Sequence, residues 1–195
     1  MNWMLFWVTL MMAYLIGSFP TALVYSRIWH GVDIRTLGDG NMGARNTKRQ
    51  FGMKAGVFVA FTDILKGIAA MYLAALADLP LEGKLAAGVL VILGHDFPIF
   101  AHFKGGQGFA TTSGVFIYLF PIPAAIGGMI YAVLMLLTHN SDLAASLAMG
   151  QLFLYQLFSG ASLLVMAFIV LTLLFVPLKQ WMDKSRRQII LQEHS

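Results

Sequence analysis

The chain alternates between long apolar stretches and short polar or glycine-rich loops, and this alternation restricts its possible folds more than any other feature. Hydrophobic residues make up 58% of the 195 residues and charged residues 11%, against about 45–50% and about 25% in soluble domains. This composition excludes an ordinary soluble enzyme, a disordered chain and a nucleic-acid-binding domain. We predict one multi-pass membrane domain, residues 1–195, built of α-helices.

The polar breaks leave seven apolar stretches, and we predict a membrane helix in each of 3–25, 55–77, 85–101, 109–121, 122–138, 143–158 and 161–177. The fourth is the weakest, because a spanning helix needs roughly 20 residues, and a re-entrant segment is the alternative there. A single helix over 109–138 would be about 45 Å long and would be broken by Pro121 and Pro123. Gly17 and Pro20 predict a kink in the first stretch.

Basic residues gather in segment 26–54 and after residue 177. Basic loops stay in the cytoplasm, and seven spans place both segments on one side, together with loops 102–108 and 138–142. We therefore predict that the N-terminus is outside and the C-terminus cytoplasmic. Residues 178–195 form a basic cytoplasmic tail in this prediction. The tail either lies against anionic headgroups or serves only to anchor the topology.

A first glycine-rich loop, residues 38–46, matches the text pattern G-x-G-x-x-G. No strand precedes it, so a dinucleotide-binding fold is excluded. Its glycines allow backbone N–H groups to approach an anion, while Asn41, Arg45, Asn46 and Arg49 add donors suited to phosphate. The alternative is a flexible loop that is basic for the sake of topology.

A second glycine-rich loop contains Lys104, Gly105, Gly106 and Gly108 and comes directly before the apolar stretch that starts at Phe109. The first turn of a helix has N–H groups without intrahelical partners, and the helix dipole also favours negative charge there. The sequence therefore predicts an anion site at this helix start. A tight turn between two short helices is the alternative.

Two ionisable pairs lie within apolar stretches. Asp63 and Lys66 are three residues apart and share one helix face, so we expect them to neutralise each other. Charged groups inside a membrane face the bundle interior or a wet cavity. His95, followed by Asp96 at the end of the third stretch, is a candidate general base because imidazole titrates near neutrality; a structural histidine is the alternative.

Several kinds of site are excluded by residues that the sequence lacks. Without cysteine there is no disulfide, thiolate metal site or thiol nucleophile. The sequence has no G-x-S-x-G nucleophile elbow and no histidine followed five residues later by aspartate, the motif of CoA-dependent glycerolipid acyltransferases. We find no spacing suited to metal ligands and expect neither a metal nor a cofactor.

Five motifs occur in a fixed order, namely YLIGSFP at 14–20, GDGNMGARN at 38–46, DILKG at 63–67, GHDFPIF at 94–100 and FKGGQGFAT at 103–111. Together they resemble the bacterial acyl-phosphate:glycerol-3-phosphate acyltransferases of the PlsY type. The resemblance covers residues 14–115, while the second half of the chain is similar mainly in its length and number of spans.

This resemblance implies a seven-span enzyme of the bacterial inner (plasma) membrane whose active site faces the cytoplasm. It would move a fatty acyl group from acyl phosphate to the 1-hydroxyl of glycerol 3-phosphate, giving lysophosphatidate without a cofactor. The predicted catalytic residues are His95, Asn41 and Lys104. The predicted substrate-binding residues are Ser18, Gly40, Arg45, Asn46, Arg49, Lys66, Gly105, Gly106, Gly108 and Thr111.

A second hypothesis follows from departures from the family pattern. Three motif positions differ from the family pattern: Asp39 replaces a serine, Arg45 replaces a threonine and Gln107 replaces a lysine. In addition, segment 178–187 lacks the histidine and the asparagine of the family's third motif. The alternatives are a non-catalytic paralogue that binds acyl phosphate or anionic lipid, or a related phosphorylated alcohol as acceptor. A transporter is disfavoured, because transporters carry polar residues at the membrane midplane.

Overall fold

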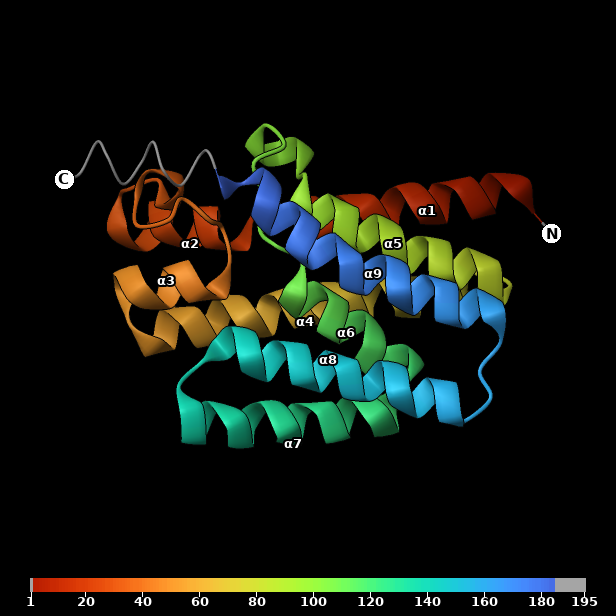
Figure 1. Cartoon of the computed structure of the whole chain (residues 1–195). Helices are drawn as coiled ribbons and strands as arrows, with labels where there is room; N and C mark the ends of the chain where they lie inside the picture. Colours follow the sequence, from red (N-terminus) through yellow and green to blue (C-terminus); the bar gives the residue numbers. More distant parts are fainter. Residues whose placement is uncertain (1, 185–195) are drawn as a thin grey trace.

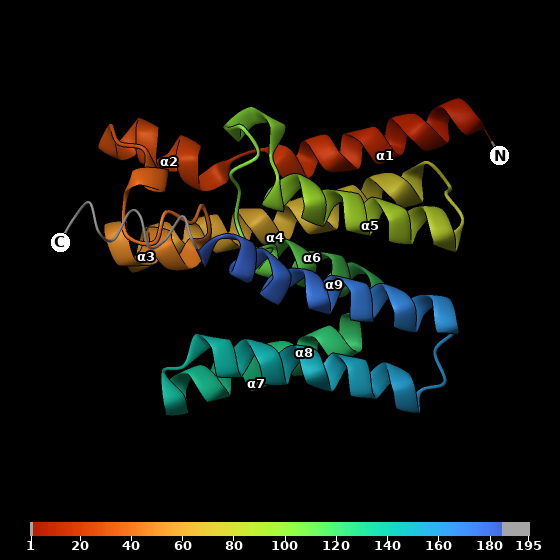
Figure 2. The same cartoon turned by 45° about the horizontal axis from the view of Figure 1, so that its top comes forward.

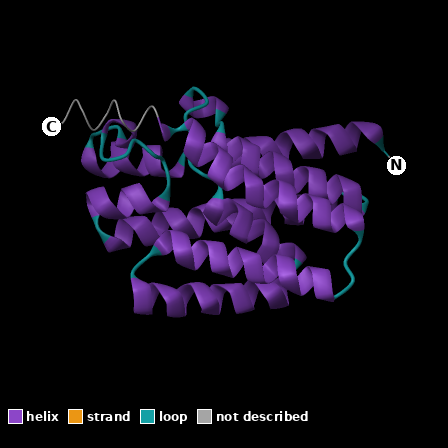
Figure 3. Ribbon diagram, viewed as in Figure 1, coloured by secondary structure: helices purple, strands orange, loops and turns teal. Residues whose placement is uncertain are grey.

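The computed structural model describes residues 2–184. Within this part of the chain every regular element is helical (Figure 3), which confirms the all-α prediction. The elements in chain order are α1 (Trp3–Ser18), α2 (Thr21–His30), η1 (Ile34–Thr36), α3 (Ala44–Phe51), α4 (Met53–Leu76), α5 (Leu81–Asp96), η2 (Ile99–Ala101), α6 (Phe109–Leu119), α7 (Pro121–Thr138), α8 (Ser141–Phe158) and α9 (Leu163–Met182).

Three prolines affect the helices in different ways. The first apolar stretch is fully broken rather than kinked, because α1 ends before Pro20 and α2 begins after it. Pro121 is the first residue of α7, a position where the missing N–H needs no partner. Pro177, in contrast, lies inside α9, which continues to Met182. The last helix therefore ends later than the predicted residue 177, because it tolerates this proline, while residues 185–195 of the predicted tail lie outside the described part of the chain.

Five helical segments among the described residues are long and apolar enough to cross a membrane, namely Trp3–His30, Met53–Leu76, Leu81–Ala101, Pro121–Thr138 and Leu163–Met182. Helix α6 has 11 residues and is about 16 Å long at 1.5 Å per residue, too short for a core of about 30 Å. The fourth predicted stretch thus forms a helix that is too short to cross the whole hydrocarbon core. The total of seven crossings stays a prediction.

The long helices run along one direction, and successive passes alternate (Figures 1 and 2). The N-terminus and the turns after α4, α6 and α8 lie at one end of the bundle. At the other end lie α2, α3, the segment 97–108 and the loop between α7 and α8. This arrangement confirms that segments 26–54, 102–108 and 138–142 share one end, while the side of the membrane that this end faces stays a prediction.

Small residues allow the helices to approach one another closely. Gly17 of α1 and Gly94 of α5 each pack against the backbone of the facing helix, and so do Gly67 of α4 and Gly114 of α6. A Cβ atom at any of these four positions would collide with that backbone. Such contacts are typical of membrane helices, whose association depends on close packing rather than on the hydrophobic effect.

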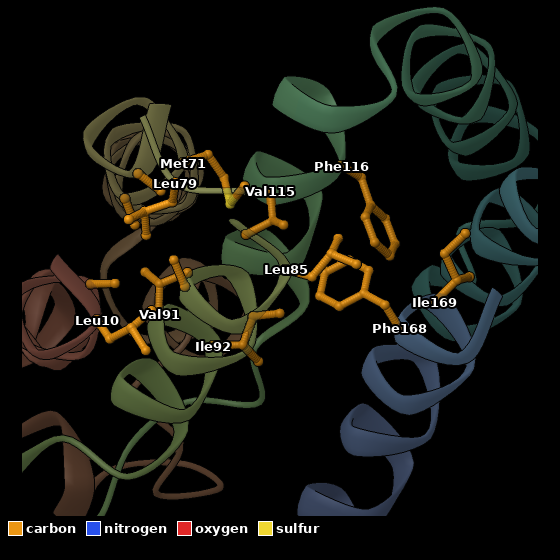
Figure 4. Packing of buried hydrophobic residues seen from close by; sticks show 14 of the residues in the cluster. Leu10, Met71, Leu79, Leu85, Val91, Ile92, Val115, Phe116, Phe168 and Ile169 are labelled. Carbon is orange, nitrogen blue, oxygen red and sulfur yellow. The ribbon is translucent and has the colours of Figure 1, made fainter. Parts of the chain in front are cut away.

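Helices α1, α4, α5, α6 and α9 enclose one apolar core (Figure 4), which includes Leu10, Met71, Val91, Ile92, Val115, Phe116, Phe168 and Ile169. Large apolar side chains such as Trp3, Phe61 and Leu163 are exposed on the outside of the bundle, as expected for a surface in contact with lipid. Val91 and Ile92 lie one turn before the last residues of α5, so the core supports the polar groups at that helix end.

Candidate functional site

Asp63 is the centre of a buried polar cluster. Its Oδ1 atom accepts hydrogen bonds from Lys66 Nζ at 2.7 Å and from Thr21 Oγ1 at 3.2 Å. The Nδ1 atom of His95 lies 3.7 Å from the same oxygen. All four side chains are buried. The predicted pairing of Asp63 with Lys66 is confirmed, whereas Thr21 was missed; its position directly after the helix-breaking proline is the signal that was available.

The break in the first apolar stretch supplies a further acceptor. Phe19 lies between α1 and α2, and its carbonyl accepts a hydrogen bond from Lys66 Nζ at 2.6 Å. The ammonium group also lies 5.8 Å from the centre of the Phe19 ring, a cation–π distance. An ammonium has three N–H donors, and the described residues provide hydrogen-bond acceptors for two. One donor of Lys66 is therefore available to a substrate oxygen.

A small pocket brings this cluster together with both glycine-rich loops. Its lining consists of Phe19, Pro20, Thr21, Met42, Asp63, Lys66, His95, Pro98 and Gly106. Three of the predicted site residues, Lys66, His95 and Gly106, are thus side by side. Met42 comes from the first loop, so segments far apart in the sequence meet at one place at the end of the bundle.

The glycines of the second loop pack directly against the end of α5. The backbone N–H of Gly106 donates to the carbonyl of His95 at 3.1 Å, and a Cβ at Gly106 would strike the His95 imidazole. A Cβ at Gly105 would collide with the carbonyl oxygens of His95 and Asp96. Gly108 has φ +70° and is the N-cap residue of α6, which begins at Phe109 as predicted. These glycines are needed for close packing as well as for the expected approach of an anion.

The first loop is held closed by Asn46. Its Nδ2 group donates to the carbonyls of Leu37 at 3.0 Å and Asn41 at 3.1 Å, and the side chain is almost fully buried. Both amide hydrogens are therefore occupied, so the geometry supports a structural role rather than the predicted phosphate contact. The side-chain carboxylate of Asp39 accepts from the backbone N–H of Asn41 at 3.1 Å, which explains why an acidic residue is accommodated here.

The predicted loop cations do not line the pocket. Arg45 pairs with Asp142 at the start of α8 at 2.6 Å, and Arg49 Nη1 lies 3.6 Å from a carboxylate oxygen of Asp39. Lys104 is exposed, and its amine has no ion-pair or hydrogen-bond partner among residues 2–184. Two of these three cations are thus close to carboxylates, and their role in binding an anion stays a prediction.

Three other predicted residues are buried outside the pocket lining. Ser18 and Thr111 have no exposed surface, and neither hydroxyl has a hydrogen-bond partner within the described part of the chain. Gly40 is buried with φ +67°. These two hydroxyls are therefore buried without a hydrogen-bond partner in this part of the chain, and the predicted substrate-binding role of the three residues stays a prediction.

A charged pair connects the two loops at their bases. The Asp33 carboxylate accepts from Arg35 at 2.9 and 2.7 Å and from Arg27 at 2.9 Å. The hydrogen bonds from Arg35 hold the pKa of Asp33 well below its usual range, and the carboxylate raises the pKa of Arg35 in return. Arg35 Nη1 also donates to the carbonyl of Ala101 at 3.1 Å, which ties the first loop to η2.

A family model for glycerol-3-phosphate acyltransferase matches residues 7–188. The chain belongs to the glycerol-3-phosphate acyltransferase family. It is 42% identical over 149 residues to glycerol-3-phosphate acyltransferase 2 of Bacillus anthracis, and this match covers 76% of this chain and 78% of that protein. It is 37% identical over 173 residues to the glycerol-3-phosphate acyltransferase of Bacillus subtilis, with 89% of each chain covered.

Two solved structures of PlsY, an integral membrane glycerol 3-phosphate acyltransferase, share the fold. The glycerol 3-phosphate form has a TM-score of 0.84 at 30% identity, and the lysophosphatidic acid form a TM-score of 0.81 at 29% identity. Each match covers 93% of this chain and 90% of the other. The pocket of this family member thus combines the Lys66 ammonium, the His95 imidazole and the closely packed Gly106.

Proposed function

We propose that the protein transfers a fatty acyl group from acyl phosphate to the 1-hydroxyl of glycerol 3-phosphate and so makes lysophosphatidate for phospholipid synthesis. The reaction takes place at the cytoplasmic face of the bacterial inner membrane. The observation that carries the proposal is the pocket in which Lys66, His95 and Gly106 meet at the basic end of the bundle. Family membership, together with the glycerol 3-phosphate and lysophosphatidic acid forms of PlsY, supports glycerol 3-phosphate as acceptor.

The chemistry needs no covalent enzyme intermediate. The hydroxyl oxygen attacks the carbonyl carbon of acyl phosphate and forms the ester bond, while the bond from that carbon to the phosphate oxygen breaks. Phosphate leaves with the electron pair, and the hydroxyl proton passes to a base. Because a mixed anhydride has a good leaving group, the protein has only to position the reactants and stabilise the developing negative charge. A chain without cysteine is suited to this task.

Each predicted residue has a role in this proposal. His95 accepts the proton, since its imidazole lines the pocket, and the remaining N–H donor of Lys66 faces a substrate oxygen. Backbone N–H groups of Gly105, Gln107 and Gly108, with Asn41, hold phosphate, since the N–H of Gly106 already donates to His95. The exposed Lys104, together with the arginines of the first loop, draws the doubly charged substrates to the pocket.

The acyl chain of the donor lies between helices in this proposal. A shallow hollow between α5 and α9 is lined by Val89, Ile92, Leu93, Leu171, Thr172 and Phe175. Five of these six side chains are apolar, and Ile92 is one turn before Asp96, at the end of α5 that contacts the second loop. An acyl chain in this hollow would have its carbonyl end near the loop and its other end in lipid.

The test is turnover by the purified full-length protein in detergent micelles. Acyl phosphate and glycerol 3-phosphate should yield lysophosphatidate and inorganic phosphate in equal amounts. The Gly106→Val variant, whose side chain would collide with His95, should lose about 100-fold or more in turnover, because misplacement by about 1 Å has this effect. Gly128→Val is the matched control, since nothing lies within 4 Å of a Cβ at that position of α7.

Two outcomes would contradict the proposal. Absence of product with acyl phosphate across a panel of phosphorylated alcohols would do so, and tight binding of acyl phosphate without turnover would then favour the non-catalytic alternative. Product formed equally well by the Gly106→Val variant would place the reaction elsewhere in the molecule.

A further inference from the structure

The segment between α5 and the second glycine-rich loop displays three large apolar side chains. Ile99, Phe100 and Phe103 are 49%, 60% and 57% exposed. They lie within residues 98–103, which include the short helix η2 and which we call the apolar loop. A cluster of exposed apolar side chains on a protein surface is typical of a site that contacts a membrane, a ligand or another protein.

The apolar loop lies at the side of the bundle. In Figures 1 and 2 it is next to the junction of α1 and α2, and α2 and α3 extend further toward that end of the molecule. Helix η2 packs against α1. Helix α3, beyond the loop, carries the exposed side chains of Arg45, Lys48 and Arg49, which require water or headgroups. The apolar loop is therefore closer to the middle of the membrane than this polar helix.

The lengths of the neighbouring helices place the apolar loop at a boundary of the hydrocarbon core. Helices α1 and α5 have 16 residues each and are about 24 Å long. A helix that starts at one boundary of a core of about 30 Å ends about 6 Å short of the other. Trp3 and Trp7, at the start of α1, are exposed, and tryptophan gathers at such boundaries. The loop directly follows α5, so it lies next to the opposite boundary.

The backbone of the apolar loop is suited to contact with lipid. Irregular backbone is unfavourable there unless its polar groups have partners. The N–H groups of Ala101 and Phe103 donate to the carbonyl of Pro98 at 3.1 and 2.9 Å. Arg35 Nη1 donates to the carbonyl of Ala101 at 3.1 Å, and the Tyr14 hydroxyl donates to the carbonyl just before Pro98 at 2.8 Å. These bonds lower the cost of bringing the loop into lipid.

We propose that the apolar loop is a lipid anchor. Ile99, Phe100 and Phe103 insert among the acyl chains of the bilayer, at the end of the bundle where the pocket lies. The exposed side chains of His102 and Lys104 stay at the level of the headgroups, which limits the depth of insertion. The anchor concerns a surface outside the pocket, so it goes beyond the proposed function and holds whichever reaction the pocket performs.

The test measures contact with lipid directly. Because the chain has no cysteine, Phe100→Cys provides a single thiol for a bimane fluorophore. The full-length protein is placed in vesicles of phosphatidylethanolamine and phosphatidylglycerol, with and without bromine on acyl-chain carbons near the headgroup. Bromine quenches the fluorophore on contact. We expect the loss of emission to match that of a probe at Phe61→Cys, an exposed position of α4, and to exceed that at Gln50→Cys, on polar α3, several-fold.

A second variant tests whether the aromatic side chains cause the insertion. With the probe at Ile99→Cys, quenching should fall several-fold when Phe100→Ser and Phe103→Ser are added. Leu136→Ser with Leu137→Ser is the matched control, since both leucines are exposed on α7, and it should leave the quenching unchanged. The Ile99 probe also checks the first result at a second position of the loop.

Three outcomes would overturn the anchor. The first is quenching at Phe100→Cys no stronger than at Gln50→Cys, together with strong quenching by iodide ions in the water. The second is a disulfide between the thiols of two Phe100→Cys chains in vesicles, with weak quenching by brominated lipid, which would assign the surface to a second copy of the chain. The third is undiminished quenching in the double serine variant, which would show that the bundle alone sets the depth of the loop.

Discussion

The ion pair between Asp63 and Lys66 allows a direct test of how the buried cluster is stabilised. Asp63→Asn keeps the side-chain volume but removes the negative charge from the ammonium. The pair is 2.7 Å long, and the two side chains are 2% and 7% exposed. Water therefore has little access to the place of the lost charge, and the ammonium is left with uncharged acceptors such as the Phe19 carbonyl.

Removing one partner of a buried ion pair destabilises a protein by about 3–5 kcal/mol. For a domain of this size, 1 kcal/mol corresponds to about 2–4 °C in the midpoint of thermal unfolding. We therefore expect the Asp63→Asn variant to unfold about 6–20 °C below the wild type. The double variant Asp63→Asn with Lys66→Met should regain most of this loss, because an apolar pair of similar volume is often as stable as a buried ion pair.

The assay is thermal unfolding in detergent, followed by circular dichroism, with a surface pair as control. Arg45 and Asp142 are 2.6 Å apart, but their side chains are 40% and 67% exposed. Asp142→Asn should change stability by no more than about 1 kcal/mol. Equal midpoint shifts for Asp63→Asn and Asp142→Asn would refute the reasoning from burial, and a double variant less stable than the single one would refute the role assigned to unpaired charge.

Three further predictions concern other parts of the fold. Asn46→Asp replaces the NH2 group, with its two N–H donors, by one oxygen that faces loop carbonyls. The KM for glycerol 3-phosphate should therefore rise about tenfold, from the 1–3 kcal/mol of an unpaired buried group; an unchanged KM contradicts the role in closing the loop. Gly114→Val should lower the unfolding midpoint strongly, whereas Gly150→Val, which meets open space on α8, should not; equal effects would exclude close packing of α4 and α6. Arg35 depresses the pKa of Asp33 in the folded protein. The stability that this ion pair contributes is therefore fully present above the pKa of an unfolded aspartate, about 3.9, and is lost as the pH falls from there through the lower pKa of the folded state. The midpoint difference between wild type and Asp33→Asn should therefore be constant from about pH 7 to pH 5 and shrink below about pH 4, and a difference that stays constant down to pH 2 would refute this assignment.

Local chemistry was enough to predict the features that depend on neighbouring residues. Pro121 ends one helix and starts another because proline lacks an N–H, and Asp63 pairs with Lys66 because three residues separate them on one helix face. The grouping of the basic loops followed from the number of apolar stretches, since each crossing reverses the direction of the chain. These inferences need no knowledge of which helices touch.

Contacts between segments that are far apart in the chain could not be predicted from the sequence. Thr21 binds a carboxylate 42 positions away, and no periodicity marks it. Lys179 follows a proline and an apolar stretch, so it was assigned to the tail, although α9 continues past Pro177 and buries this lysine with Asp183. Asn46 was interpreted as a phosphate donor because of its amide, but the fold of its own loop uses both amide hydrogens. The identity of such partners depends on tertiary packing.

The short length of α6 determines the depth in the membrane at which acyl phosphate, a reactive mixed anhydride, would bind. A helix of 11 residues covers about half the thickness of the hydrocarbon core, so the irregular backbone before it descends between the longer helices (Figure 1). Such backbone is tolerated at this depth only when protein surrounds it, and Gly105, Gly106 and Gly108 are buried. If the proposed function holds, this burial would keep bulk water from the acyl carbonyl, and little of the donor should be lost by hydrolysis to free fatty acid.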